Sequence, residues 1–256
     1  MQMKFIAILA LATLPFAADA KSYTMRSPDR RLELTVDVGA ELRYSLKRDR
    51  DVLIAPSPIS ISLGNGQVLG HRALVQSIER ESERDVIQPS INHRSPIKEH
   101  YNEITFEFKG DYEVEFRLYN EALAYHFETD FDEDIVVIDE QATFLLPYDS
   151  HFWINALGTE ADANSISTYE IDKSLYLPIF VERRGGGKIV IRESNSGNYP
   201  RMTLSPQANP LGFISHFAPF QYYIKDGDYE LPWRIVEVVD RDLDLLDSSI
   251  MYKLED

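Results

Sequence analysis

The fold is decided by residues 101–128, which read YNEITFEFKGDYEVEFRLYNEALAYHFE. Apolar residues alternate with polar ones on both sides of the turn Lys109-Gly110-Asp111. A period of two gives each strand one apolar and one charged face, and the short glycine turn joins the two strands as an antiparallel hairpin. A third alternating run begins at Leu123, so the stretch predicts a three-stranded meander.

The same alternation recurs along the chain, whereas helical periodicity is scarce. Further strands are predicted at 32–38, 42–46, 59–63, 135–138, 142–146, 175–182, 188–193, 200–204, 212–217, 220–225 and 233–240. A short helical turn is expected within 241–250, and the polar stretches 82–100 and 158–172 are expected to be loops. The sequence therefore predicts an all-β domain, a large antiparallel β-supersandwich with few short helices that spans residues 21–256.

Residues 1–20 have the pattern of a secretion signal. Lys4 precedes an apolar run over 5–16, and Ala18-Asp19-Ala20 gives the small-x-small pattern before a cleavage expected ahead of Lys21. A retained membrane anchor is the alternative, but the run is short for a bilayer. No later segment is long and apolar enough to cross a membrane, so we expect a periplasmic or secreted product and no membrane partner.

The composition excludes several classes of function. The chain has no cysteine, which excludes disulfides, thiolate metal sites and a cysteine nucleophile. Its 42 acidic residues against 26 lysines and arginines give a net charge of -16. This acidity argues against nucleic-acid binding, which needs a cationic surface, and is compatible with neutral sugars or a divalent cation.

No catalytic motif stands out. The six histidines are not spaced as a zinc pair, there is no G-x-S-x-G elbow, and Gly185-Gly186-Gly187 lacks the residues of a phosphate loop. Trp153, next to His151 and near Tyr148, is a candidate for stacking on a sugar ring, although such rings also fill β-sandwich cores. We assign Trp153 and Tyr148 as candidate substrate-binding residues and no catalytic residue.

Glu193 ends the apolar strand predicted at 188–193, just before a polar turn. A carboxylate at the edge of a sheet is placed to bind a hard cation through oxygen. From the residues alone, a solvated strand end is the favoured interpretation of Glu193, and a cation ligand is the alternative.

Three groups of motifs resemble glycoside hydrolase family 97. The run from Glu193 to Tyr199-Pro200-Arg201-Met202 is similar to the family's E-S/A-D-L-x-x-Y-P-x-M segment. Residues 101–127 resemble its Y-N-E-L and F-R-x-Y-N-E-G-V-A-Y-R-F motifs, and Pro232-Trp233-Arg234 with Leu245-Leu246 resembles the end of the same domain. The resemblance covers about residues 22–254.

This resemblance implies an N-terminal β-supersandwich from a secreted α-glucosidase or α-galactosidase. The catalytic carboxylates of such enzymes lie on a following (β/α)₈ barrel, and a calcium ion near the active site takes one glutamate from the N-terminal domain, which corresponds to Glu193. Such a barrel is absent from this sequence, so we expect no hydrolysis by the chain alone and calcium binding only with the barrel present. The implied partners are an α-linked oligosaccharide and the barrel domain.

Two departures from the family motifs matter. His126 stands where the family has an arginine, which makes it a third candidate substrate-binding residue, and Asn195-Ser196 replaces Asp-Leu. Two alternatives stay open: a free-standing periplasmic carbohydrate-binding protein, and an enzyme like the aldose epimerases of the galactose mutarotase-like fold. The latter would draw its acid–base groups from His100, His126, His151 or His216 with Glu103 or Glu128.

Overall fold

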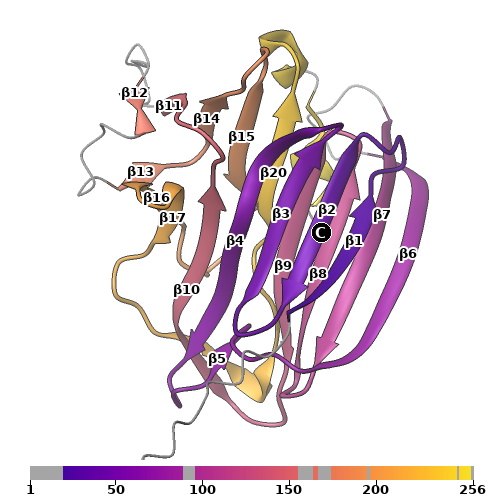
Figure 1. Cartoon of the computed structure of the whole chain (residues 1–256). Coiled ribbons are helices and arrows are strands. Elements are labelled where there is room, and N and C mark those ends of the chain that lie inside the picture. Colours follow the sequence, from indigo (N-terminus) through magenta and orange to yellow (C-terminus); the bar gives the residue numbers. More distant parts are fainter. Residues whose placement is uncertain are drawn as a thin grey trace, which may run out of the picture.

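The computed structural model describes residues 20–88, 96–154, 164–166, 174–194, 197–246 and 248–254. Two large, mainly antiparallel sheets face each other and form a sandwich (Figure 1). This architecture confirms the predicted all-β fold with a few short helices. In the described part of the chain, no helix is long and apolar enough to cross a membrane.

The first sheet has the strand order β1-β2-β3-β4-β10-β17-β16-β13, with β5 beside β4 and β18 beside β10. Its strands are β1 (Lys21–Arg26), β2 (Leu32–Val38), β3 (Leu42–Arg48), β4 (Asp51–Leu63), β5 (Val68–Leu69), β10 (Ile135–Leu145), β13 (Leu175–Tyr176), β16 (Thr203–Ala208), β17 (Leu211–His216) and β18 (Tyr222–Ile224).

The second sheet has the order β12-β11-β14-β15-β20-β9-β8-β7-β6, with β19 beside β9. Its strands are β6 (Val75–Ile87), β7 (Ile97–Phe108), β8 (Tyr112–Tyr119), β9 (Ala122–Asp130), β11 (His151–Ile154), β12 (Asn164–Ser165), β14 (Ile179–Glu182), β15 (Lys188–Glu193), β19 (Asp228–Glu230) and β20 (Arg234–Val239). The short helical elements are η2 (Lys225–Gly227), η3 (Asp242–Leu245) and α1 (Ile250–Lys253).

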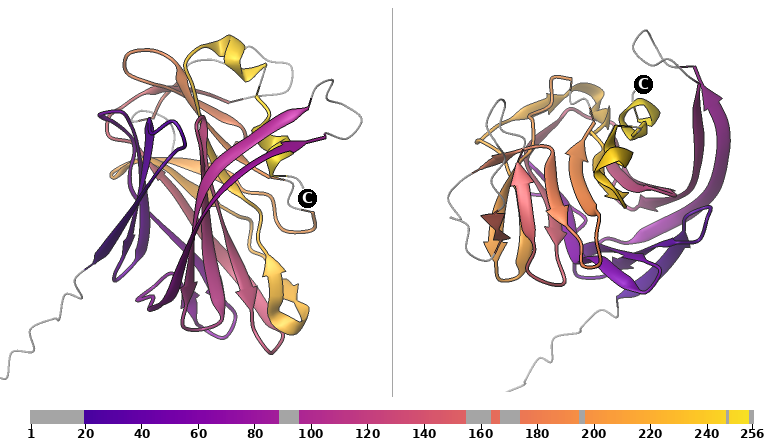
Figure 2. Two further views of the ribbon diagram at one scale, coloured as in Figure 1. Left: turned by 90° about the vertical axis from the view of Figure 1, so that its right-hand side faces the viewer. Right: turned by 90° about the horizontal axis from the view of Figure 1, so that it is seen from above.

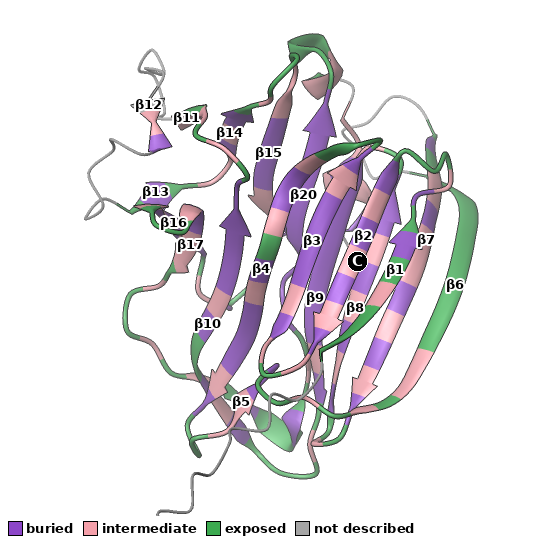
Figure 3. Cartoon of the chain, in the orientation of Figure 1, coloured by how far each residue is buried: buried purple, intermediate pink, exposed green. Residues whose placement is uncertain are grey.

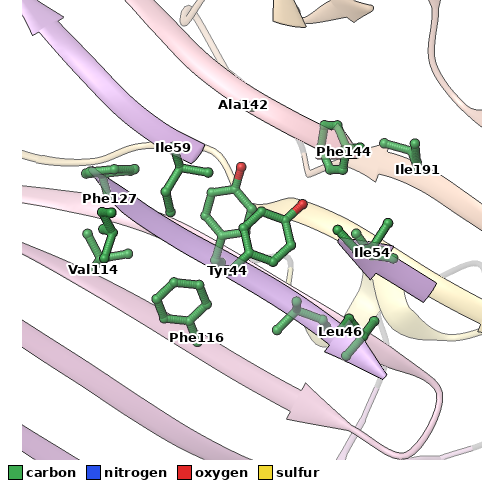
Figure 4. Packing of buried hydrophobic residues seen from close by; sticks show 14 of the residues in the cluster. Tyr44, Leu46, Ile54, Ile59, Val114, Phe116, Phe127, Ala142, Phe144 and Ile191 are labelled. Carbon is green, nitrogen blue, oxygen red and sulfur yellow. The ribbon is translucent and has the colours of Figure 1, made fainter. Parts of the chain in front are cut away.

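The predicted meander forms the β9-β8-β7 part of the second sheet, next to the edge strand β6. Ile104 on β7 pairs with Phe116 on β8, which pairs with Tyr125 on β9. All three side chains are buried in the core between the sheets, where Tyr44 of the first sheet packs on Tyr125. Figure 4 shows Tyr44 and Phe116 among the residues of this core. The alternation read from the sequence therefore fixes which face of these strands enters the core.

The interpretation of 82–100 as a loop is wrong for residues 82–87 and 97–100, which are strand, whereas 89–95 lie outside the described residues. β6 and β7 form a long hairpin whose pairing continues from Val75 with Phe108 to Ile87 with Ile97. β6 is exposed over most of its length, and the hairpin curves away from the sandwich (Figures 2 and 3). A search for alternating apolar residues does not detect β6, because the outer part of the hairpin carries charged residues on both faces and has no apolar face.

The second sheet has two faces with different surroundings. Its core face packs on the first sheet, and its outer face is covered in the middle by α1. Ile250 and Leu254 pack there against Tyr101, Tyr119 and Ile235, which form a second, smaller hydrophobic cluster. Figure 2 shows the hairpin curving around the side on which this C-terminal helix lies.

Other predictions differ in detail. The strand expected at 175–182 is divided into β13 and β14 around Pro178, and the short helical turn expected near the end is divided into η3 and α1. The signal segment lies outside the described residues except for Ala20, and only 164–166 of the loop expected at 158–172 are described.

Candidate functional site

Glu193 lies in a cluster of charged groups at the end of β15. Arg234, the first residue of β20, pairs with it across the two strands. The Arg234 guanidinium donates from Nη1 to Glu193 Oε2 at 2.7 Å and, through Nε and Nη2, to both oxygens of Glu140 at 2.6 Å. Glu140 belongs to β10 of the first sheet, so Arg234 joins the two sheets through one guanidinium.

Burial makes this cluster unusual. The Arg234 side chain is 1 % exposed, and Tyr199 donates its hydroxyl to Glu140 Oε2 at 3.0 Å. Burial alone would lower the pKa of the Arg234 guanidinium, but the charges and hydrogen bonds of Glu140 and the charge of Glu193 outweigh it and raise the pKa. The arginine therefore stays charged, and its bidentate geometry compensates for its removal from water.

The Glu193 carboxylate is held through one of its two oxygens. Oε2 accepts from Arg234 and from the backbone N–H of Met202, at 3.1 Å, whereas no hydrogen bond to Oε1 is found among the described residues. The side chain is 13 % exposed. Burial raises its pKa, while the charge of Arg234 and the Met202 N–H act in the opposite direction.

A cation site is incomplete in the described part of the chain. No three His, Asp or Glu side chains are arranged there to hold a metal ion. Calcium takes six to eight oxygen ligands, so Glu193 fits the ion as one donor of an oxygen set that other groups must complete. Asn195-Ser196, where the sequence departs from the family pattern, lies outside the described residues.

The two aromatic candidates do not form one platform. Trp153 is partly exposed on β11, and the Lys188 ammonium lies 5.2 Å from its ring centroid. Tyr148, between β10 and β11, contacts the β14–β15 turn: its hydroxyl accepts from the N–H of Arg184, and the Arg184 guanidinium lies 4.2 Å from its ring centroid. A cation therefore lies over each ring, and that face of the ring is not free for stacking on a sugar.

His126 is far from Trp153. β14, β15 and β20 separate its strand from β11, which amounts to about 19 Å across the sheet. The imidazole is 3 % exposed and stacks on Trp233 with ring centroids 3.8 Å apart. Its Nε2 lies 3.4 Å from Glu115 Oε2, so the structure pairs it with a residue that sequence reasoning did not select.

Glu115 belongs to a second charged cluster, on the outer face of the second sheet. Arg117 Nε lies 2.6 Å from Glu115 Oε1 and 2.9 Å from Glu103 Oε2. Its guanidinium also lies over the rings of Tyr101 and Trp233. Among the epimerase-type combinations, the structure brings His126 and Glu103 into this cluster.

The two carboxyl groups of this cluster titrate far apart. Burial and the hydrogen bond and charge of Glu115 raise the pKa of Glu103 to about 7. Burial also opposes ionisation of Glu115, but hydrogen bonds from His126 and Glu103 and the charge of Arg117 lower its pKa to about 2. Between these two pKa values the pair holds one proton, on Glu103, while Glu115 is ionised beside the arginine.

Comparison with known proteins assigns the chain to a family. A family model described as "Glycosyl-hydrolase 97 N-terminal" matches residues 25–256. A retaining alpha-galactosidase of Bacteroides thetaiotaomicron is 30 % identical over 290 residues, which cover 99 % of this chain and 44 % of that protein. The chain therefore spans less than half of this relative.

Solved structures share the fold. A glycoside hydrolase family 97 enzyme from Pseudoalteromonas sp. strain K8, in complex with acarbose, superposes with a TM-score of 0.80 at 18 % identity, over 91 % of this chain and 38 % of that one. A beta-arabinopyranosidase superposes with a TM-score of 0.73 at 18 % identity, over 85 % and 40 % of the two chains. The chain belongs to glycoside hydrolase family 97, and its sequence corresponds to the N-terminal domain of that family.

Proposed function

We propose that this domain forms a wall of the substrate cleft of an α-glycosidase and gives one carboxylate oxygen of Glu193 to calcium. The observation that carries the proposal is the one-sided anchoring of Glu193. Arg234 and Met202 hold Oε2. Oε1 forms no hydrogen bond within the described chain, and the side chain keeps partial exposure at the end of β15. A fixed carboxylate with one uncommitted oxygen is suited to a hard cation shared with a neighbouring domain.

The chemistry of cleavage is assigned to the region that longer relatives carry beyond this domain. Glycoside hydrolysis needs two carboxyl groups flanking the bond, one acting as acid and the other as base or nucleophile. The buried or partly buried carboxylates of the two charged clusters, Glu103, Glu115, Glu140 and Glu193, are each engaged with an arginine. The domain alone is therefore expected not to hydrolyse 4-nitrophenyl α-galactoside or α-glucoside, and turnover at rates typical of an enzyme would contradict the proposal.

The role of Glu193 is tested in a chimera in which this domain replaces the matching part of the Bacteroides retaining alpha-galactosidase. Glu193→Gln keeps the shape of the side chain and removes its charge, so calcium should bind at least about tenfold more weakly in titration calorimetry. Glu182→Gln, at the exposed end of neighbouring β14, is the matched control and should leave the calcium affinity unchanged. Equal calcium affinity in all three chimeras would refute the assignment.

The proposal includes export to the periplasm or beyond. The basic start, apolar run and Ala18-Asp19-Ala20 pattern support it. N-terminal sequencing of the protein recovered outside the cytoplasm should begin at Lys21. Recovery of full-length chain in the cytoplasmic fraction would oppose it.

A further inference from the structure

A cavity of about 490 Å³ lies between edge strand β1 and the β6–β7 hairpin. It is separate from the cluster around Glu193, which lies at the end of β15. Residues 24–28 line it on one side, and on the other side it is lined by the face of the hairpin that continues the core face of the second sheet. Cavities of roughly 300–1,000 Å³ hold small ligands, so this one is large enough for one or two sugar units.

The strand register sorts the charges of the hairpin onto two faces. Ile78 and Phe106 pair and point into the core, and the same parity places Arg80, Ser82 and Arg84 on β6 on that face, with His100 and Asn102 on β7. The acidic residues take the other face: Glu79, Glu81, Glu83 and Asp85 on β6, and Glu99, Glu103 and Glu107 on β7.

Basic side chains therefore dominate the cavity, although two glutamates border it. Glu81 and Glu103 are paired across the strands, and the Glu103 side chain bonds to Arg117 on the outer face, so its carboxylate points away from the cavity. The cationic lining residues are Arg26, Arg30 and Arg80. The lining thus holds three arginines and two glutamates, and because the Glu103 carboxylate is turned to the outer face, positive charge prevails there in a chain with a net charge of -16.

Two of these arginines are available to a ligand. Arg26 is paired with Glu33 at 2.8 Å. Within the described ranges, neither Arg30 nor Arg80 forms an ion pair with a carboxylate. Arg80 is instead held over the cavity, because its Nη1 donates to the backbone oxygen of Thr24 at 3.1 Å, which leaves its other N–H groups for an incoming anion.

We propose that this cavity binds a sugar unit that carries a carboxylate or a sulfate group. The guanidinium fork matches the geometry of such oxyanions and can bond them in bidentate fashion. The Ser82 hydroxyl and the Asn102 side chain lie on the same face, where polar groups can meet sugar hydroxyls. The anionic part follows from the arginines, and the sugar part rests on the proposed glycosidase function.

The test is titration calorimetry of the chain with digalacturonate, galactose 6-sulfate and neutral galactobiose, in buffer containing a calcium chelator. The acidic ligands should bind, more weakly as ionic strength rises, and the neutral disaccharide should bind about tenfold more weakly or not at all. Comparing the affinities for digalacturonate and galactose 6-sulfate shows whether the cavity prefers a carboxylate or a sulfate group. Absence of binding by both, or equal binding of the neutral disaccharide, would overturn the proposal.

Substitutions locate the binding. Arg80→Gln and Arg30→Gln should each weaken binding of the acidic ligand about tenfold, because each removes a charged hydrogen-bond donor. Arg50→Gln, at the exposed β3–β4 turn, is the control and should stay within about twofold of the parent. Thermal unfolding confirms that the variants fold, and acid-ligand affinity unchanged in both cavity variants would refute the site. Calcium is chelated and no turnover is measured, so this outcome is independent of the Glu193 proposal.

Discussion

Arg234 and Arg117 lie on opposite faces of the same sheet, and each holds two glutamates. Arg234 is 1 % exposed between the sheets, whereas Arg117 is 25 % exposed on the outer face. Around Arg234, each N–H group that meets a carboxylate oxygen lies within 2.7 Å of it. Around Arg117, one carboxyl group has a pKa near neutrality. The difference in burial thus gives the two clusters different properties. The Arg234 cluster stays ionised and joins the two sheets, whereas the Arg117 cluster contains a group, Glu103, that titrates near neutral pH.

Removing the inner arginine should have the largest effect. Arg234→Met leaves Glu140 and Glu193 buried without their cation, which should destabilise the domain by about 3–5 kcal/mol in urea unfolding. The control is Arg43→Met, because Arg43 pairs with Glu41 on the exposed face of the first sheet, and its loss should cost less than about 1 kcal/mol. Similar costs for the two variants would show that burial does not distinguish these ion pairs.

Removing the outer arginine should cost less. Arg117→Met also leaves two carboxyl groups, those of Glu103 and Glu115, without their arginine. Glu103 has a pKa near 7, however, so it can take up a proton and remain neutral. We expect a loss of about 2–3 kcal/mol at pH 7 in the same urea experiment. A loss as large as that of Arg234→Met would erase the distinction between the two clusters.

The sequence predicts one part of this comparison well. Alternation over 101–128 gave the meander and its buried face, and the family motifs singled out Glu193 and the Trp233-Arg234 pair. It did not reveal Glu140 as the partner, because 94 residues separate the two and no local pattern links them. A signal is nevertheless present in the alternation of each strand. Arg234 and Glu140 both occupy positions whose side chains face the core, and a buried charge needs a partner of opposite sign.

The β6–β7 hairpin is a region that the sequence analysis did not predict. Its 13-residue strand β6 carries acidic residues on one face and basic ones on the other, so periodicity in charge takes the place of periodicity in hydrophobicity. A search for apolar alternation assigns such a strand to a loop. The same charge pattern, once recognised, predicts both the strand and the cationic face that lines the cavity.

Within the inner cluster, the tyrosine is the next test. Tyr199→Phe removes the hydrogen bond to Glu140 Oε2, but that oxygen keeps its bond from Arg234 Nη2. The expected loss is about 1–1.5 kcal/mol in urea unfolding. Tyr223→Phe, whose hydroxyl is on the exposed surface, is the matched control and should be nearly neutral. No difference between the two variants would mean that the inner network does not depend on this hydroxyl.

The smallest effect should appear in the pH dependence of the outer cluster. Between pH 4.5 and 7 the unfolded chain loses the Glu103 proton while the folded protein keeps it, so this group makes stability fall as pH rises. Glu115, with its pKa near 2, stays ionised in the folded protein, so its own contribution has the opposite sign and disappears above about pH 5.5, where the unfolded chain is ionised at this position as well. Glu103→Gln should therefore reduce the loss of stability between pH 5 and 7 by about 1 kcal/mol after allowing for solvent screening, or about 2–4 °C in Tm. Glu81→Gln, the exposed cross-strand neighbour of Glu103, is the control and should follow the parent. If the stability of Glu103→Gln changes with pH in parallel with that of the parent, Glu103 does not titrate in this range and the outer cluster does not differ from the inner one in this respect.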